Sequence, residues 1–287
     1  MAVEAQGFAK QATLKDSVAV SGVGLHSGTK TTVELSPAPA DTGIVFKSKG
    51  VSIPALVEHV IGTRRGTTLG VGDVAVHTVE HLLSAFRGLG VDNAFVDVDG
   101  EEIPAMDGSA WAYIEAIGKA GVKIQENAVR PILEYARKES FVATIGLSSY
   151  KVLPWDAFKV SVSISFPGTL IGVQELEHCA NGSYPSEIGR ARTFCLESEV
   201  DELRRAGLAK GGSLDNTIVV GSQAVKVNEP LRYKDEFVRH KILDFFGDIS
   251  LIGPGEYRFS CFAMAPSHKS NTEFIRRLRE HLTRRLP

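Results

Sequence analysis

The sequence has few cysteines, little net charge and no long hydrophobic run. Its three cysteines, Cys179, Cys195 and Cys261, are widely spaced and odd in number, so they predict free thiols. A formal net charge of −2 argues against a nucleic-acid-binding protein, which is usually basic. No apolar run approaches the ~20 residues of a membrane-spanning helix, and residues 1–16 lack the apolar stretch of a signal peptide. We therefore expect a cytoplasmic protein without stable membrane insertion.

The chain is long enough for one large domain or two ordinary ones. It has 287 residues, of which 43% are hydrophobic, so it can bury a core without disulfide or metal support. Strand-like alternation is clear in residues 158–166, and helical periodicity is clear in residues 77–90. The pattern breaks near residues 124–135, and strands begin again after it. We therefore expect an α+β protein with a first domain at 1–126 and a second at 127–287.

Residues 236–248, EFVRHKILDFFGD, predict a helix that carries a polar stripe made of His240, Asp244 and Asp248. Each step of four residues turns the direction on a helix by only about 40°, so these side chains share one narrow face. A histidine and an aspartate at this spacing can reach one metal ion, because their Cβ atoms lie ~5–6 Å apart. The alternative interpretation is the solvent-facing stripe of an ordinary amphipathic helix.

The stretch HTVEH holds a second pair of histidines around Glu80. A metal-dependent hydrolase combines histidine or carboxylate ligands with a carboxylate that acts as general base. In one interpretation His77 and His81 bind the metal and Glu80 is the base, as in the H-x-x-E-H signature of inverted zinc peptidases. In the other, His81 joins His240 and Asp244 in a site with two histidines and one aspartate.

Longer blocks of the sequence decide between these interpretations. They are TVEHLLSAFRGLGVDNAFVDVDGEEIPAMDGSA, LRYKDEFVRHKILDFFGDISLIG, SGVGLHSG, GRARTF and GGSLDNTIVV. In these blocks and in their order, over nearly its whole length, the chain resembles the zinc-dependent UDP-3-O-acyl-N-acetylglucosamine deacetylases of bacterial lipid A synthesis. The resemblance implies two similar β-α-α-β layered domains with the active site between them, and removal of the N-acetyl group from an acylated UDP-sugar. A zinc peptidase of the H-x-x-E-H type and a non-catalytic UDP-sugar-binding relative are the alternatives.

The resemblance also implies roles for particular residues. The implied ligands of one Zn²⁺ per chain, with Fe²⁺ as the alternative metal, are His81, His240 and Asp244. The implied catalytic residues are the general base Glu80, the carbonyl-binding hydroxyl of Thr193, the acid His268 that protonates the leaving amine, and Asp248, which keeps that histidine charged. The implied substrate contacts are Phe194 and Lys241.

Two further segments bear on substrate and partners. The resemblance places an insert near residues 194–212, where it forms a passage for the fatty acyl chain. The basic amphipathic helix expected over residues 271–287 docks on its own domain, with peripheral contact to an anionic membrane as the alternative. We expect a monomer that binds no nucleic acid.

The sequence departs from the family pattern at two places. Ala265 stands where a basic residue ordinarily faces the diphosphate; either Lys269 or another basic side chain replaces it, or the nucleotide binds differently. Arg64 and Arg65 stand where apolar residues are common, near the expected entrance of the acyl passage. Both departures bear on which substrate is bound more than on the proposed hydrolysis.

Overall fold

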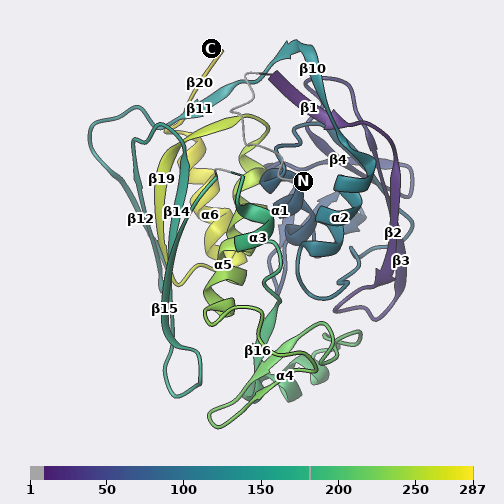
Figure 1. Ribbon diagram of the computed structural model, residues 1–287, viewed down its shortest axis with the longest axis vertical. Coiled ribbons are helices and arrows are strands. Elements are labelled where there is room, and N and C mark those ends of the chain that lie inside the picture. The colour runs from purple at the N-terminus through teal and green to yellow at the C-terminus, as the bar shows by residue number, and fades with distance from the viewer. Residues whose placement is uncertain (1–9, 181, 287) are drawn as a thin grey trace.

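The computed structural model has two large β-sheets, one from each half of the chain, with the main helices between them (Figure 1). It describes residues 10–180 and 182–286; residues 1–9 of the first predicted domain, and residues 181 and 287 of the second, lie outside the described residues. The mixture of sheets and helices confirms the predicted α+β class. Among the described residues, no helix is long and apolar enough to cross a membrane.

The first half forms a five-stranded sheet in the order β2-β3-β9-β4-β5, in which only β4 and β9 pair in parallel. Alternation along β3 buries Val33 and Leu35 on one face, and the helices α1 and α2 lie on the inner side of the sheet (Figure 1). A small sheet, β6-β7-β8, is inserted before α1, and β1 pairs with β10. The bounds are Lys10–Leu14 (β1), Val18–Val23 (β2), Lys30–Pro37 (β3), Ile44–Ser48 (β4), Val51–Pro54 (β5), Val57–His59 (η1), Val60–Gly62 (β6), Thr68–Val71 (β7), Val74–Val76 (β8), Glu80–Gly88 (α1), Ala94–Val98 (β9), Trp111–Ala120 (α2) and Val122–Val129 (β10).

The second half forms a seven-stranded sheet around β19, which pairs with β11, β13 and β14. The strict alternation predicted for β14 is observed, and it buries Phe158, Val160 and Val162 against the helices. Helices α5 and α6 lie on the inner side of this sheet (Figure 1). The bounds are Ile132–Glu134 (β11), Phe141–Ile145 (β12), Ser148–Leu153 (β13), Phe158–Phe166 (β14), Gly172–Cys179 (β15), Tyr184–Glu187 (α3), Glu236–Ile249 (α5), Ser250–Ile252 (η3), Glu256–Met264 (β19), His268–Arg279 (α6) and Thr283–Arg285 (β20).

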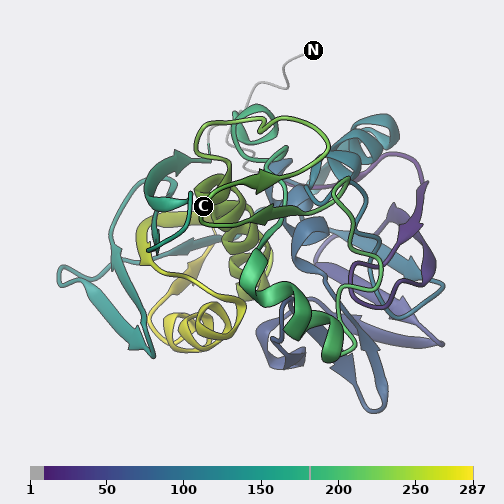
Figure 2. The same ribbon diagram turned by 90° about the horizontal axis from the view of Figure 1, so that it is seen from below.

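A second small sheet, in the order β16-β17-β18, projects from the second half, and the segment predicted as an insert begins with its strand β16 and continues into η2 and α4. Figure 2, seen from below, shows this region in front of the junction between the two halves. Leu203 is the buried residue of its helix α4. The bounds are Phe194–Leu196 (β16), Glu197–Glu199 (η2), Val200–Arg205 (α4), Ile218–Val220 (β17) and Val225–Lys226 (β18).

Helices α1 and α5 bring the two halves together. They pack closely because Gly247 of α5 lies directly against the backbone of Glu80: a Cβ atom at Gly247 would lie 2.1 Å from the Glu80 carbonyl oxygen. One continuous hydrophobic core runs through both halves and includes side chains of both helices. The polar groups at the start of α1 and along α5 therefore meet at the centre of the molecule.

Two predicted helices have different bounds in the structure. The helix predicted over residues 77–90 begins only at Glu80, because Thr78 has a φ of +60°, which no α-helix contains. The helix predicted over 271–287 begins earlier and ends at Arg279, and Thr283–Arg285 instead pairs with β11. This short strand covers the otherwise free edge of β11, which explains why helical periodicity does not continue to the end.

Candidate active site

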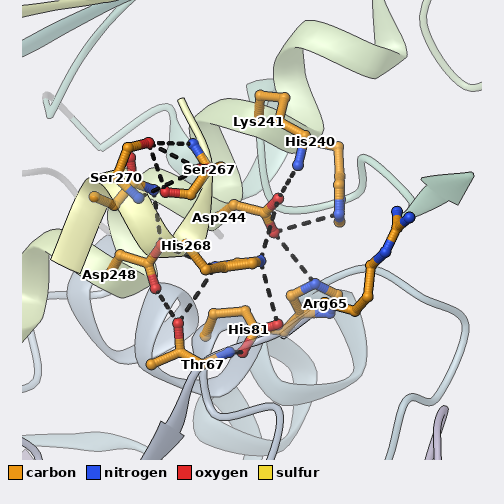
Figure 3. Close-up of polar contacts among 12 residues, drawn as sticks. Arg65, Thr67, His81, His240, Lys241, Asp244, Asp248, Ser267, His268 and Ser270 are labelled. Carbon is orange, nitrogen blue, oxygen red and sulfur yellow. Dashed lines mark hydrogen bonds and ion pairs between the residues drawn. The ribbon is translucent and has the colours of Figure 1, made fainter. Parts of the chain in front are cut away.

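The three predicted metal ligands converge at the junction of α1 and α5. The ligand atoms of His81, His240 and Asp244 all lie within 4.8 Å of one another. The Nε2 atom of His240 is 3.3 Å from Oδ1 of Asp244, and the Nε2 atom of His81 is 3.5 Å from the same oxygen (Figure 3). Two imidazole nitrogens from different halves of the chain thus face one carboxylate oxygen.

This arrangement fits a divalent cation. Oδ1 of Asp244 is buried and has no hydrogen-bond partner among the described residues, so nothing in the described chain satisfies it. Burial lowers the pKa of His240 to about 3, which keeps the imidazole in the neutral form that binds metals. Although burial raises the pKa of Asp244, the positive charges of Lys241 and His268 hold it well below its usual value, so the carboxylate is charged. Neutral histidine and charged carboxylate are ligands that zinc accepts.

A buried ion pair orients His240. The Nδ1 atom of His240 lies 3.0 Å from the carbonyl oxygen of Ala191, so an Nδ1 proton bonds this oxygen and leaves Nε2 free to bind a metal. The next residue, Arg192, forms an ion pair at 2.9 Å with Glu236, the first residue of α5, and both are almost fully buried. Glu236 also accepts from the backbone amide of Arg192 at 3.1 Å. The carbonyl of Ala191 is therefore fixed relative to α5.

His268 lies beside this site and is held by Asp248. Its Nδ1 atom is 2.9 Å from Oδ2 of Asp248, which also accepts at 2.7 Å from the side-chain amide of Asn271. Burial lowers the pKa of His268, but the carboxylates of Asp248, Glu80 and Asp244 outweigh it and raise the pKa to about 10. The imidazole is thus charged at neutral pH and can give up a proton.

Glu80 faces His268 across the site. Its side chain is 2% exposed, and burial raises its pKa. Its Oε1 atom is 3.6 Å from Nε2 of His268, and its Oε2 atom accepts a hydrogen bond from the backbone amide of Thr67 at 2.9 Å. A carboxylate with a raised pKa, held beside a charged imidazole, has the properties of a general base.

Of the three remaining predicted residues, Phe194 and Lys241 lie beside the metal ligands. Thr193 is fixed by its backbone, which donates to Gly108 at 2.8 Å, and its position is two residues after the carbonyl that orients His240. The ring of Phe194 is 6.2 Å from the ring of His240, edge to face. Lys241 donates to Oδ2 of Asp244 at 2.7 Å, and its ammonium group lies 5.5 Å from the centre of the Phe194 ring.

His77 lies away from the cluster. It is exposed, its Nδ1 atom contacts the hydroxyl of Thr68 at 3.0 Å, and it does not belong to the group that can hold a metal. The turn at Thr78 separates it from α1, so His77 and His81 do not share a helix face. The peptidase interpretation needs both histidines to face one metal ion, and the described residues do not have that arrangement.

The glycine-rich stretch SGVGLHSG donates backbone hydrogen bonds to a side-chain carboxylate of the same chain, that of Glu102. The carboxylate of Glu102 accepts from the backbone amides of His26 and Ser27 at 2.8 Å and 2.7 Å, and also from the hydroxyl of Thr78. A Cβ atom at Gly24 would lie 2.3 Å from this carboxylate, so a larger residue there would displace Glu102. The loop therefore supports the turn that precedes Glu80.

The two departures from the family pattern have different surroundings. Ala265 is exposed, has a φ of +48° and accepts from the hydroxyl of Ser148 at 2.7 Å through its carbonyl. Lys269, one residue after His268, lines a groove between β6 and α6. Arg65 also has a positive φ, of +61°, and forms an ion pair at 2.7 Å with Glu199 of the insert.

Three side chains that can hold one cation, beside a buried carboxylate and a charged imidazole, define the class of metal-dependent hydrolases. The chain belongs to the UDP-3-O-acyl N-acetylglycosamine deacetylase family, whose model matches residues 11–280. It is similar to the UDP-3-O-acyl-N-acetylglucosamine deacetylase of Teredinibacter turnerae, with 43% identity over 279 residues that cover 94% of this chain and 90% of that protein. The deacetylase of the same name from Acidithiobacillus ferrooxidans is 45% identical over 251 residues, which cover 85% of this chain and 82% of that protein.

Proposed function

We propose that this chain hydrolyses the N-acetyl amide of UDP-3-O-acyl-N-acetylglucosamine, releasing acetate and a free amine, as a step of lipid A synthesis. The observation that carries this proposal is the convergence of His81, His240 and Asp244 beside Glu80 and His268. Membership of the deacetylase family supplies the substrate. Water is the second reactant, so the reaction needs a base for water and an acid for the departing nitrogen.

The metal is proposed to be one Zn²⁺ per chain, held by His81, His240 and Asp244, with Fe²⁺ as the alternative because the same ligand set accepts both. When bound, such a cation polarises the amide carbonyl and lowers the pKa of water towards ~7. The unpaired Oδ1 atom of Asp244 supports this assignment.

The side chains around the metal site then divide the proton transfers between them. Glu80 takes the proton from the attacking water, and its raised pKa suits a group that must bind that proton. Thr193 donates to the developing oxyanion through its hydroxyl. His268 protonates the leaving amine, and Asp248 holds it in its charged form. An amide nitrogen leaves only as a neutral amine, so the charge on His268 is essential.

Substrate recognition is assigned to residues at the edge of the site. Phe194 and Lys241, which lie next to the metal ligands, contact the acylated UDP-sugar, and the insert near residues 194–212 forms the acyl passage. We place the boundary of the two domains near residues 126 and 127, within β10 and just before β11, and expect a cytoplasmic monomer.

The test combines metal analysis with a deacetylation assay on the purified protein. Metal-free protein should regain acetate release when Zn²⁺ or Fe²⁺ is added, in proportion to the metal bound. A peptide substrate, tested in parallel, should not be cleaved. Full metal occupancy without acetate release would contradict the proposal and favour a non-catalytic sugar-nucleotide binder, whereas peptide cleavage would favour the peptidase alternative.

A further inference from the structure

Thr67 contacts both of the groups that would move protons, although it can move none itself. Its backbone amide donates to Oε2 of Glu80 at 2.9 Å. Its hydroxyl donates to Oδ1 of Asp248 at 2.6 Å and lies 3.3 Å from Nδ1 of His268 (Figure 3). The residue is fully buried, so no water competes for these bonds.

The hydroxyl completes the hydrogen bonding of Asp248. Oδ2 of this carboxylate already accepts from His268 at 2.9 Å and from Asn271 at 2.7 Å, whereas Thr67 is its partner at Oδ1. A carboxylate bonded at both oxygens cannot rotate about its Cβ–Cγ bond without losing one of them. Thr67 therefore fixes the plane of Asp248, and through it the direction in which His268 points.

The backbone of Thr67 is itself held in place. Its carbonyl accepts from the amide of Val79 at 3.1 Å, in the turn that leads into α1. The preceding residue, Gly66, lies close to the side chain of Glu80. A Cβ atom at Gly66 would lie 3.0 Å from Oε1 of Glu80, so a larger residue there would push the loop away. On the other side, the carbonyl of Arg65 lies 3.1 Å from Nε2 of His26. The loop is thus anchored within the first half while its hydroxyl reaches a carboxylate of the second.

We infer that Thr67 is a positioning residue that sets the geometry of the base and the acid with respect to each other. Its amide orients Glu80, its hydroxyl orients the Asp248–His268 pair, and this one residue fixes the two proton-transfer groups relative to each other. This inference rests on the proposed roles of Glu80 and His268. It predicts that the hydroxyl matters for turnover and not for substrate binding.

The test replaces Thr67 by valine, which keeps the shape and the backbone amide but removes the hydroxyl, and by serine, which keeps the hydroxyl. Thr67→Val should lower kcat by ~10–100-fold, the usual effect of removing a group that orients a catalytic side chain, with KM and metal content unchanged. Thr67→Ser should restore most of kcat. Thr13→Val is the matched control, because its buried hydroxyl bonds the backbone of Asn93 and Ala38, outside the site; it should lower stability without lowering kcat.

A spectroscopic measurement on metal-free protein gives a second readout. The Nδ1 proton of His268, observed by NMR, should shift or exchange faster in Thr67→Val and return to its original position in Thr67→Ser. An unchanged kcat and an unchanged His268 signal in Thr67→Val would overturn the inference, while the wild-type protein still released acetate. Absence of acetate release by the wild-type protein would instead overturn the proposed function.

Discussion

Helices α1 and α5 both supply the candidate site, but they do so in different ways. α5 presents His240, Asp244 and Asp248 along three successive turns of a regular buried helix. α1 presents Glu80 and His81, its first two residues, immediately after a turn in which Thr78 has a positive φ. One helix therefore positions its groups by its own periodicity, and the other positions them by where it begins.

The difference shows what each helix depends on. The side chains of α5 keep their mutual spacing as long as the helix forms, so only its placement must be fixed, and the Arg192–Glu236 ion pair at its first turn does this. The position of α1 depends on a turn that is supported from outside by Glu102 and Thr67. Variants can separate these two kinds of support.

The largest effect is expected from removing ligands. His81→Ala and His240→Ala should each abolish stable metal binding and reduce acetate release to background, because each removes one of the three proposed ligands. His77→Ala should retain metal and activity, because His77 is exposed and outside the cluster. Metal content after dialysis measures both; loss of metal in His77→Ala would contradict the site described here.

Removing the proposed base, Glu80, should not affect metal binding. Glu80→Gln keeps the size of the side chain but cannot accept the proton of water, so kcat should fall by ~10²–10⁴-fold. Metal content should equal that of the wild-type protein. A Glu80→Gln variant with unchanged turnover would refute the assignment of Glu80 as base.

Loosening the anchor of α5 should weaken metal binding more moderately. Glu236→Gln leaves the buried guanidinium of Arg192 without its charged partner, so the carbonyl of Ala191 should lose its fixed position. We expect the Zn²⁺ affinity, measured by chelator competition, to fall by ~10–100-fold. Asp235→Asn is the control, because it weakens a partly exposed ion pair between the residue just before α5 and Arg239; it should cost at most ~1 kcal/mol, with unchanged metal affinity.

Adding one methyl group at Gly247, where α1 and α5 are in contact, should lower the stability of the protein. Gly247→Ala would place a Cβ atom 2.1 Å from the Glu80 carbonyl oxygen, so the free energy of unfolding should fall by ~1–3 kcal/mol. Gly118→Ala in α2 meets nothing within 4 Å and should raise that free energy by ~0.5–1 kcal/mol. Thermal or urea unfolding measures both, and a stabilising effect of Gly247→Ala would show that the helices are not in close contact.

What could be predicted from the sequence follows the same division. Residues 158–166 form the strand that their alternation predicts, because burial of one face is a local property. The polar stripe on α5 could be predicted for the same reason. The residue at which α1 begins could not be predicted, because the turn at Thr78 is held by Glu102, and the local sequence pattern does not show that Glu102 lies nearby. The same pattern wrongly suggested that His77 and His81 share a helix.

Other functional contacts gave no signal in the sequence because they use the backbone or distant partners. The carbonyl of Ala191 orients His240, and because every residue type has a backbone carbonyl, no side chain marks this position in the sequence. Thr67 bonds Glu80 through its amide and Asp248 through its hydroxyl, and no sequence pattern distinguishes this loop threonine from the others. The end of α6 depends on the pairing of Thr283–Arg285 with β11.

The division of the ligands between the halves has a consequence for synthesis. A nascent chain still attached to the ribosome, with residues up to about the middle exposed, has His81 but neither His240 nor Asp244. It therefore cannot form the proposed metal site, so loading would follow translation of α5. A cation bound there would stabilise only the folded state, and a chelator would then loosen the joint between the two halves.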